Sequence, residues 1–271
     1  MSAEPPLLEV RDLAIAFGGV QALAGVDLTV APRALVSLIG PNGAGKTTLF
    51  NCICGLYRPD RGTIRLRGVS LVGRRPDEVA RLGVARTFQN LELFRHATVL
   101  DNVLLGRHLH IRTPLLAAAC AMPGWRREEV RHRRRVEELL DLLDLQAVRH
   151  RRVGDLPIGQ QRLVELARAL ALEPVLLLLD EPSAGMTAEE KAELVFRIKD
   201  VQEAWGVAVV LVEHDLRLVM EISERVTVLD HGVRIAEGTP QEVQRHPEVI
   251  RAYLGAAPAE GAAWPAEAPL R

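Results

Sequence analysis

Residues 40–48 read Gly40-Pro41-Asn42-Gly43-Ala44-Gly45-Lys46-Thr47-Thr48. They fit the pattern G-x-x-x-x-G-K-S/T, a loop whose backbone N–H groups wrap phosphate groups. The glycines allow the positive φ angles and the close backbone approach that such a loop needs. Lys46 is expected to reach the β- and γ-phosphates of a nucleotide, and the Thr47 hydroxyl is expected to bind Mg²⁺. The predicted phosphate contacts are Asn42, Gly43, Ala44, Gly45, Lys46, Thr47 and Thr48.

The sequence on either side of the loop supports the same interpretation. Residues 34–39 form a short apolar run typical of a strand, and residues 48–54 have helical spacing, so a phosphate would lie at a helix N-terminus. Glycine-rich turns between a strand and a helix also occur by chance. Only three of the 34 basic residues are lysines, and one of these occupies the loop. A compact ammonium fits between phosphates where the wide guanidinium fork of arginine would not.

Length and charge exclude several classes of protein. With 271 residues the chain can form one large domain, or a core with a subdomain. Its formal net charge of −1 provides no basic field, so nucleic acid is not an expected partner. The start of the chain does not resemble a signal peptide, and no apolar run approaches the ~20 residues that span a bilayer. We expect a protein that is soluble or that contacts a membrane through a partner.

The three cysteines, Cys52, Cys54 and Cys120, do not make a disulfide framework. Cys52 and Cys54 lie two positions apart on the helix expected after the loop, so they face different directions. We interpret them as small buried hydrophobic residues in a reducing compartment, and a C-x-C metal site is the alternative.

The order of the expected elements predicts an α/β fold. Glycine-bounded strands are expected early in the chain, at residues 8–17, 26–30 and 62–68. From Thr98 onward apolar residues recur with helical spacing. Apolar runs typical of strands buried on both faces follow at residues 175–179, 207–212 and 226–229. Alternation of strand and helix implies a mostly parallel sheet with helices on both faces.

Capping boxes predict where two helices begin in the second half of the chain. Thr187 is followed at the third position by Glu190, and Thr239 by Glu242 with a proline between them. The Ala/Pro-rich tail, residues 256–271, is expected to be disordered.

Two adjacent carboxylates, Asp180 and Glu181, follow the apolar run at residues 175–179. At the C-terminal end of a parallel strand they would face the ligand crevice. Asp180 suits Mg²⁺, directly or through water, as a second anchor beside Thr47. Glu181 suits the polarisation of an attacking water molecule. An Asp-Glu pair after a strand can also be an ordinary loop start, and the phosphate loop is what favours the functional interpretation.

Four motifs occur in an order that resembles the ATP-binding subunit of an ABC transporter. After the phosphate loop come Leu156-Pro157-Ile158-Gly159-Gln160-Gln161-Arg162, the run ending in Asp180-Glu181-Pro182, and Val212-Glu213-His214-Asp215. The resemblance covers about residues 7–255, and it implies a P-loop ATPase cassette. Such a cassette has a RecA-like sheet, an N-terminal antiparallel β subdomain and an inserted helical subdomain, here at about residues 90–165, with ATP and Mg²⁺ as cofactors.

Three stretches are closer still to the branched-chain amino acid importer subfamily. They are residues 47–51, residues 86–90 with Leu93-Phe94, and residues 249–255. Lipopolysaccharide-export and urea-import ATPases are similar to the same stretches.

The resemblance implies roles for residues whose type alone would mean little. Phe17 matches the aromatic that stacks on adenine, and its alternative is a core aromatic. Gln89 matches the glutamine that touches Mg²⁺ or the attacking water. His214 matches the switch histidine that contacts the γ-phosphate. Gly159 and Gln160 belong to a signature segment that meets the nucleotide of a second subunit, so two cassettes would share two ATP molecules.

The signature departs from the usual Leu-Ser-Gly-Gly-Gln. Pro157 replaces a serine that donates a hydroxyl, and Ile158 replaces a glycine. The loop that usually ends in Leu-Asp reads Met186-Thr187 here. Both changes affect the partner's site or its communication, so we expect an asymmetric heterodimer, with a homodimer as the alternative.

The region expected to be helical also contains an arginine cluster, which consists of Arg126, Arg127, Arg131, Arg133, Arg134 and Arg135. We interpret this cluster as a solvated helix face, with contact to lipid or a permease as the alternative.

The leading functional hypothesis is the motor of a membrane importer, bound to transmembrane permease subunits at the cytoplasmic face of the inner membrane. A lipid or lipopolysaccharide exporter and a urea or amide importer are close rivals, and a non-hydrolysing ATP-binding scaffold is a more distant one. Cassettes of the ribosome-associated and DNA-maintenance classes are disfavoured, because the chain has one phosphate loop and no long insertion. The sequence does not name the transported solute, because selectivity belongs to other subunits.

Overall fold

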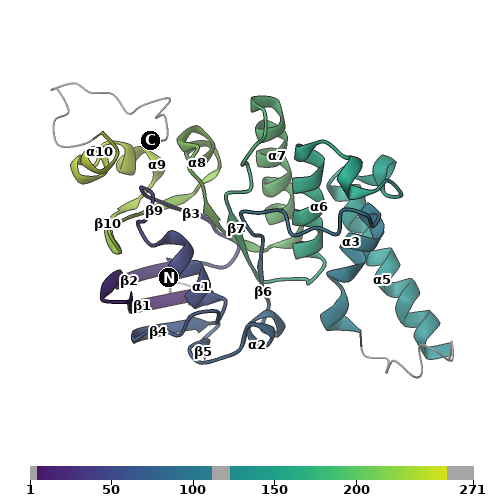
Figure 1. Ribbon diagram of the computed structural model, residues 1–271, viewed down its shortest axis with the longest axis horizontal. Coiled ribbons are helices and arrows are strands. Elements are labelled where there is room, and N and C mark those ends of the chain that lie inside the picture. Colours follow the sequence, from purple (N-terminus) through teal and green to yellow (C-terminus); the bar gives the residue numbers. More distant parts are fainter. Residues whose placement is uncertain (1–4, 112–122, 255–271) are drawn as a thin grey trace.

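The computed structural model describes residues 5–111 and 123–254, and these residues build two sheets flanked by helices (Figure 1). The predicted tail at residues 256–271 and Cys120 lie outside the described residues. The strands are β1 Leu8–Phe17, β2 Val20–Val30, β3 Leu35–Ile39, β4 Arg61–Leu66, β5 Val69–Ser70, β6 Val84–Arg86, β7 Leu176–Asp180, β8 Ala208–Val212, β9 Arg225–Asp230 and β10 Val233–Gly238. The helices are α1 Lys46–Ile53, α2 Pro76–Arg81, α3 Val99–Leu105, α5 Pro123–Leu142, α6 Ile158–Leu170, α7 Ala188–Trp205, α8 Leu216–Ile222, α9 Pro240–Gln244 and α10 Pro247–Leu254. Short 3₁₀ turns lie at η1 His108–His110, η2 Gln146–Val148 and η3 Val153–Asp155.

The larger sheet has six strands in the order β10-β9-β3-β8-β7-β6. All neighbouring pairs are parallel except β9 and β10, which form an antiparallel pair at one edge. The predicted mostly parallel sheet is confirmed. Its central strands read as continuous apolar runs because both faces are covered, as a parallel sheet requires.

Alternate residues of the central strands enter two different cores. Leu177, Leu179 and Leu211 pack in the core that contains α3, α5, α6 and α7. Leu176 and Leu178 face the opposite core, which contains α1 and the N-terminal sheet. Side chains of a strand point to opposite faces in turn, so the sheet separates the helical layer from the N-terminal β layer.

The smaller sheet is antiparallel, with the order β2-β1-β4-β5. The N-terminal strands were expected at residues 26–30 and 62–68, and both differ at their ends. β2 begins earlier, at Val20, because it pairs with the whole of β1 after the turn at residues 18–19. β4 ends at Leu66 because Arg67 and Gly68 have positive φ angles of 49° and 80° and form the turn into β5.

Helices α3, α5 and α6 lie together at one end of the molecule, away from β1 and β2 (Figure 1). Thr187 and Thr239 are the N-caps of α7 and α9, each in a capping box, as predicted. Thr98 caps α3 in the same way. The side-chain acceptors satisfy backbone N–H groups that the first turn of a helix leaves without partners.

Candidate functional site

The phosphate loop connects β3 to α1, and two of its glycines have backbone conformations that are unfavourable for other residues. Gly45 is the N-cap of α1 with φ 100°, and a Cβ atom there would lie 2.6 Å from the Ala22 carbonyl oxygen. Gly40 has φ 151°, and a Cβ atom there would overlap the carbonyl oxygen of Leu229. The loop therefore passes against the backbones of β2 and β9 at positions that only glycine fits.

Lys46 is held inside this loop by the loop itself. Its Nζ donates to the carbonyl oxygens of Gly40 at 2.6 Å and Pro41 at 3.0 Å, and the residue is 6% exposed. Burial lowers the pKa of Lys46, while the negative charges of Glu181 and Asp180 act in the opposite direction. The ammonium is thus positioned at the mouth of the loop and close to both carboxylates.

A pocket of about 190 Å³ lies over the loop. Its lining consists of Ala22, residues 42–48, Glu181 and His214. Successive backbone N–H groups at a helix N-terminus, one buried ammonium and a threonine hydroxyl are the donor set that holds nucleotide phosphates. The residues present therefore fit a nucleotide with Mg²⁺, for which Thr47 offers a hydroxyl in the lining; Asp180, the second predicted metal ligand, is 3% exposed and lies outside the lining.

The two carboxylates and the histidine meet because their strands are neighbours. Asp180 ends β7 and pairs with Val212 at the end of β8, and His214 follows two residues later. Glu181 donates its backbone N–H to Val212 O at 2.8 Å, and its φ of 49° is unusual for a residue other than glycine. Glu181 thus has a strained backbone conformation, and it lies at the carboxyl edge of the sheet, where ligands of parallel sheets bind.

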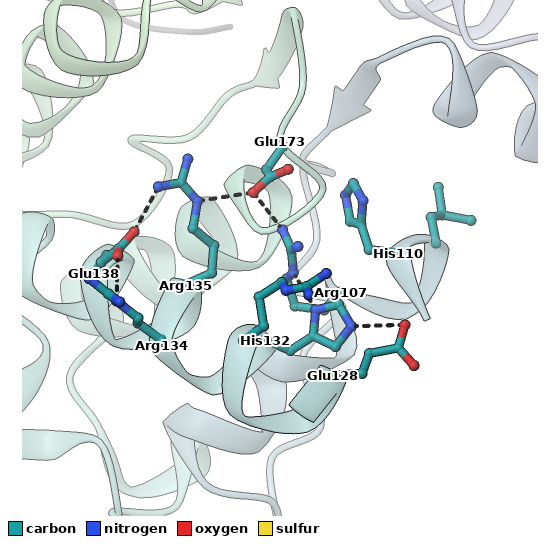
Figure 2. Close-up of a pocket in the computed structure, with 10 residues that line it drawn as sticks. Arg107, His110, Glu128, His132, Arg134, Arg135, Glu138 and Glu173 are labelled. Carbon is teal, nitrogen blue, oxygen red and sulfur yellow. Dashed lines mark hydrogen bonds and ion pairs between the residues drawn. The ribbon is translucent and has the colours of Figure 1, made fainter. Parts of the chain in front are cut away.

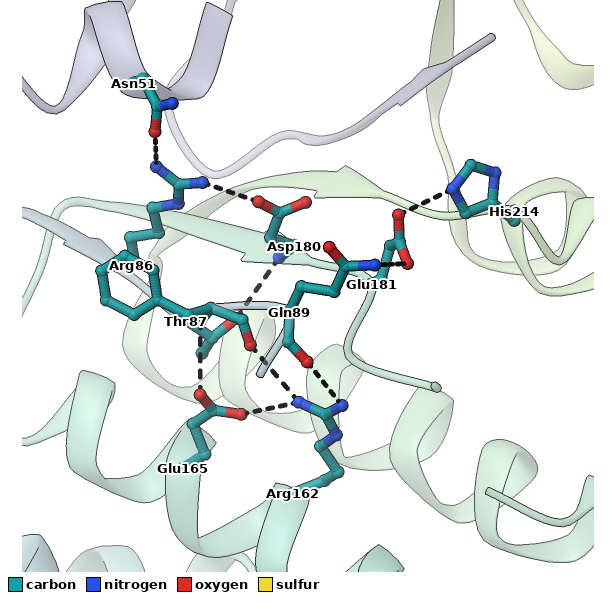
Figure 3. A network of polar contacts seen from close by, with 10 residues as sticks. Asn51, Arg86, Thr87, Gln89, Arg162, Glu165, Asp180, Glu181 and His214 are labelled. Atoms are coloured by element: carbon teal, nitrogen blue, oxygen red, sulfur yellow. Dashed lines mark hydrogen bonds and ion pairs between the residues drawn. The ribbon is translucent and has the colours of Figure 1, made fainter. Parts of the chain in front are cut away.

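Glu181 is contacted from two sides by the other predicted residues of the reaction centre. Gln89 Nε2 donates to Glu181 Oε2 at 2.9 Å, and His214 Nε2 lies 2.7 Å from Glu181 Oε1 (Figure 3). One hydrogen bond therefore joins Gln89 to Glu181, although they are more than 90 positions apart in the sequence. The structure brings together Lys46, Thr47, Gln89, Glu181 and His214 at one end of the sheet.

Sequence reasoning missed two polar residues near Asp180: Arg86, which contacts it, and Asn51, which contacts Arg86. Arg86 Nη2 donates to Asp180 Oδ2 at 2.7 Å, and Arg86 Nη1 donates to Asn51 Oδ1 at 2.6 Å. Both residues lie in the stretches that resemble the branched-chain amino acid importer subfamily, at residues 47–51 and 86–90. An arginine at the end of a buried strand is a signal that could have pointed to a buried anionic partner.

The segment that carries Gln89 is held by α6 through a buried ion pair. Arg162 Nη1 lies 3.1 Å from Glu165 Oε2, with the two side chains 6% and 3% exposed. Arg162 Nη2 donates to Gln89 O at 2.9 Å, and Glu165 Oε1 accepts from Phe88 N at 3.3 Å. Burial raises the pKa of Glu165, and Arg162 opposes the rise. The sequence signal that could have indicated this ion pair is the presence of Arg162 and Glu165 among the buried apolar residues of α6.

Glu213 fixes the backbone around His214. Its carboxylate is 3% exposed and accepts from Ser183 N at 2.9 Å and from His214 N at 3.1 Å. Burial raises the pKa of Glu213, and these backbone N–H groups pull it back toward the ordinary value.

The signature segment lies outside the pocket over the loop. Pro157 is the N-cap of α6 and supplies no side-chain cap, while Gly159 N donates to Glu190 Oε1 at 3.2 Å. Glu190 belongs to the capping box of α7, so one carboxylate caps both helices. Gln160 Oε1 is buried without a hydrogen-bond partner among the described residues. The structure does not bring Gly159 and Gln160 to this chain's own phosphate loop.

Phe17 lies at the end of β1 and is not a core residue. It is 45% exposed, and its ring centroid is 5.1 Å from that of Tyr57, with the planes at 64°. Its ring is thus accessible for stacking, although Phe17 does not line the pocket over the loop.

Residues 23–184 match the family model described as ABC transporter. This chain belongs to the ABC transporter family. Residues 233–259 of the cassette also match a model described as branched-chain amino acid ATP-binding cassette transporter.

Two curated relatives are similar to the cassette over almost their whole length. One is the high-affinity branched-chain amino acid transport ATP-binding protein BraF of Pseudomonas aeruginosa, which is 43% identical over 93% of this chain and 99% of its own. The other is the corresponding protein LivG of Escherichia coli strain K12, which is 42% identical over the same shares.

Solved structures agree with the fold. The ADP conformation of an ATP-binding cassette of an ABC transporter matches with a TM-score of 0.82 and 29% identity, over 93% of this chain and 100% of that chain. A dimeric post-hydrolysis cassette bound to ADP and Pi matches with a TM-score of 0.71 and 27% identity, over 86% and 98%.

The arginine cluster of the cassette lies on α5, where Arg126, Arg127, Arg131, Arg133 and Arg134 are exposed. Arg135 is half-buried, contacts Glu138 and Glu173, and stacks 4.0 Å above the Trp205 ring. Ion pairs run along this exposed helix face, from Arg133 to Glu129 and from Arg134 to Glu138.

The remaining sequence-based expectations concern cysteines and the membrane. Cys52 is buried and Cys54 is half-buried, and burial raises the pKa of each thiol to about 11. Within the described ranges no three His, Cys, Asp or Glu side chains are placed to hold a metal ion. Across residues 5–111 and 123–254, no helix combines the length and apolar character needed to cross a bilayer.

Proposed function

We propose that this cassette is the ATP-hydrolysing motor subunit of a membrane importer for branched-chain amino acids. The observation that carries the proposal is 43% identity over 93% of the chain to a branched-chain amino acid transport ATP-binding protein. The match of residues 233–259 supports it from a part of the chain that is separate from the phosphate loop.

In this proposal the residues of the site divide into binding and reacting groups. ATP with Mg²⁺ supplies the anhydride bond whose hydrolysis drives transport. Residues 42–48 hold the phosphates, Thr47 and Asp180 bind Mg²⁺, and Phe17 stacks on the adenine. Glu181 polarises the attacking water, and its contacts with Gln89 and His214 support this role because they fix both carboxylate oxygens.

The cassette also needs a second ATP-binding subunit in this proposal. Gly159 and Gln160 lie away from the chain's own pocket, as expected of groups that act on a nucleotide in a partner. Pro157 offers no hydroxyl, so this chain would make a weaker contact with the partner's nucleotide than the partner makes with the nucleotide of this chain. We therefore propose an asymmetric heterodimer, bound to permease subunits as a peripheral protein on the cytoplasmic face of the inner membrane.

The asymmetry is tested by ATP turnover. The isolated cassette is expected to hydrolyse ATP slowly, and an equimolar mixture with the second cassette of the same transporter is expected to be at least about tenfold faster. Equal turnover of the isolated chain would show that its own signature is sufficient, and the heterodimer proposal would fail.

The transport proposal is tested in proteoliposomes that contain the permease recovered with this cassette from membranes. ATP hydrolysis is expected to rise when an external binding protein loaded with leucine, isoleucine or valine is added. Stimulation by urea, by an amide or by lipopolysaccharide instead would assign the cassette to one of the rival transporters.

A further inference from the structure

Arg86 is a buried cation to which the family resemblance assigns no role. It ends β6 at the sheet edge and pairs in register with Leu178, two positions before Asp180. Its side chain is 7% exposed, and that of Asp180 is 4% exposed. A charge that is removed from water at this depth is strongly unfavourable unless its hydrogen bonds are well made.

The guanidinium of Arg86 joins three separate parts of the site. Nη2 donates to Asp180 Oδ2 at 2.7 Å and Nη1 to Asn51 Oδ1 at 2.6 Å (Figure 3). Its central carbon lies 5.5 Å from the ring centroid of Phe50 and 5.1 Å from that of Phe88. Helix α1, which begins at Lys46, is thereby linked to the end of β7 and to the segment leading to Gln89.

This contact uses one of the two carboxylate oxygens of Asp180. Among the described residues, the Asp180 side chain accepts one hydrogen bond, from Arg86 to Oδ2, and Oδ1 receives none. We propose that Arg86 is a positioning residue, which holds Asp180 through Oδ2 and so keeps Oδ1 as the oxygen available to Mg²⁺ or to its bound water. The inference rests on the proposed role of Asp180 in binding MgATP.

Arginine suits this position because its fork reaches two acceptors on different elements at once. A lysine could neutralise Asp180, but its donors are all on one nitrogen atom, and it lacks the planar guanidinium that lies near both phenylalanine rings. The Asn51 contact matters because it fixes the guanidinium relative to α1, and hence fixes Asp180 relative to Thr47.

The test compares wild type with Arg86→Lys, Asp180→Asn and the double variant, with Arg75→Lys as a control whose side chain is 72% exposed. Affinity for a fluorescent ATP analogue is measured in EDTA and in Mg²⁺, and the ratio of the two affinities is the readout. Arg86→Lys is expected to keep its affinity in EDTA and to lose about tenfold of the Mg²⁺ enhancement, the effect of one charge-assisted hydrogen bond. In the Asp180→Asn background the same change is expected to have no further effect on the ratio, because Arg86 acts through Asp180.

Three results separate the possible failures. An unchanged Mg²⁺ enhancement in Arg86→Lys overturns the positioning role, and an equal loss of affinity in EDTA and in Mg²⁺ shows a purely structural role and also overturns it. If wild type itself shows no Mg²⁺-dependent binding, the proposed function fails instead. Should Arg86→Lys not fold, Asn51→Ala decides: it removes the acceptor that fixes the Arg86 guanidinium relative to α1, so a reduced enhancement supports the proposal and a wild-type ratio overturns it.

Discussion

At the scale of single residues, Glu181 is the carboxylate that the proposed function places next to the attacking water. Its positive φ angle places its carboxylate between Gln89 and His214, so both oxygens have partners. Strain of this kind persists only where the surrounding contacts over-determine it, and it is frequent at functional sites.

Glu181→Gln tests its role directly. The amide keeps the size of the side chain but cannot accept a proton, so ATP binding is expected to persist while turnover falls by about 100-fold or more. Equilibrium binding of an ATP analogue and steady-state phosphate release measure the two effects separately. Glu189→Gln, on the exposed first turn of α7, is the matched control. Turnover that survives in Glu181→Gln would assign the reaction to another group.

The residues of this site differ in how far the sequence predicts them. Lys46, Asp180 and Glu181 follow from short motifs, because each motif fixes a residue relative to a strand end. The contacts of Arg86 with Asp180 and of Glu190 with Gly159 do not, because only the fold brings these residues together.

At the scale of elements, α6 connects the signature segment to the segment that carries Gln89. The helix begins at Ile158, and one turn later the Arg162–Glu165 ion pair contacts the backbones of Phe88 and Gln89. A buried ion pair of this kind contributes little net stability, but the loss of one partner leaves the other charge uncompensated.

Arg162→Met is expected to destabilise the cassette by about 3–5 kcal/mol, because Glu165 would remain buried without its cation. The double variant Arg162→Met/Glu165→Leu is expected to recover most of this free energy of unfolding, since no charge then remains buried. Urea denaturation measures both. Arg61→Met, at an exposed ion pair with Asp12, should change stability by less than about 1 kcal/mol. A double variant as unstable as the single one would contradict this explanation.

Helix α5 contributes His132 and Arg135 to a second polar cluster, which lines a pocket of about 400 Å³ (Figure 2). Buried Arg107 contacts Glu173 Oε1 at 3.1 Å and donates through Nε to His132 Nδ1 at 3.3 Å. Arg135 reaches the same Glu173 oxygen at 3.0 Å. These contacts tie α5 to the end of α6, and they require His132 to be neutral because its Nδ1 accepts.

Burial, together with the Arg107 charge, lowers the pKa of His132. The unfolded chain therefore binds this proton more readily than the folded chain, so the free energy of unfolding should decrease as pH falls below the ordinary histidine pKa of about 6.5. His132→Gln keeps an acceptor for Arg107 and should remove this part of the acid sensitivity. Urea denaturation at pH 7.5 and pH 5.5 compares the two proteins. A larger loss in the variant than in wild type would show that the sign is wrong.

At the scale of the whole molecule, the hydrophobic pattern of the sequence predicts the strands and helices of each layer. It predicts less well which residues of different layers contact each other. The central strands of the large sheet and the caps of α7 and α9 follow from apolar runs and capping boxes, which are local in sequence. The cap that Glu190 provides for α6 depends on a contact between residues 31 positions apart in the sequence. Local signals carry no information about such partners.

A structure determined with Mg²⁺ and a non-hydrolysable ATP analogue tests the central claim most directly. The triphosphate should lie on the backbone N–H groups of residues 42–48, and Lys46 Nζ should leave the carbonyl oxygens of Gly40 and Pro41 for phosphate oxygens. A loop that binds no phosphate under these conditions, with Lys46 still on its own carbonyls, would contradict the account.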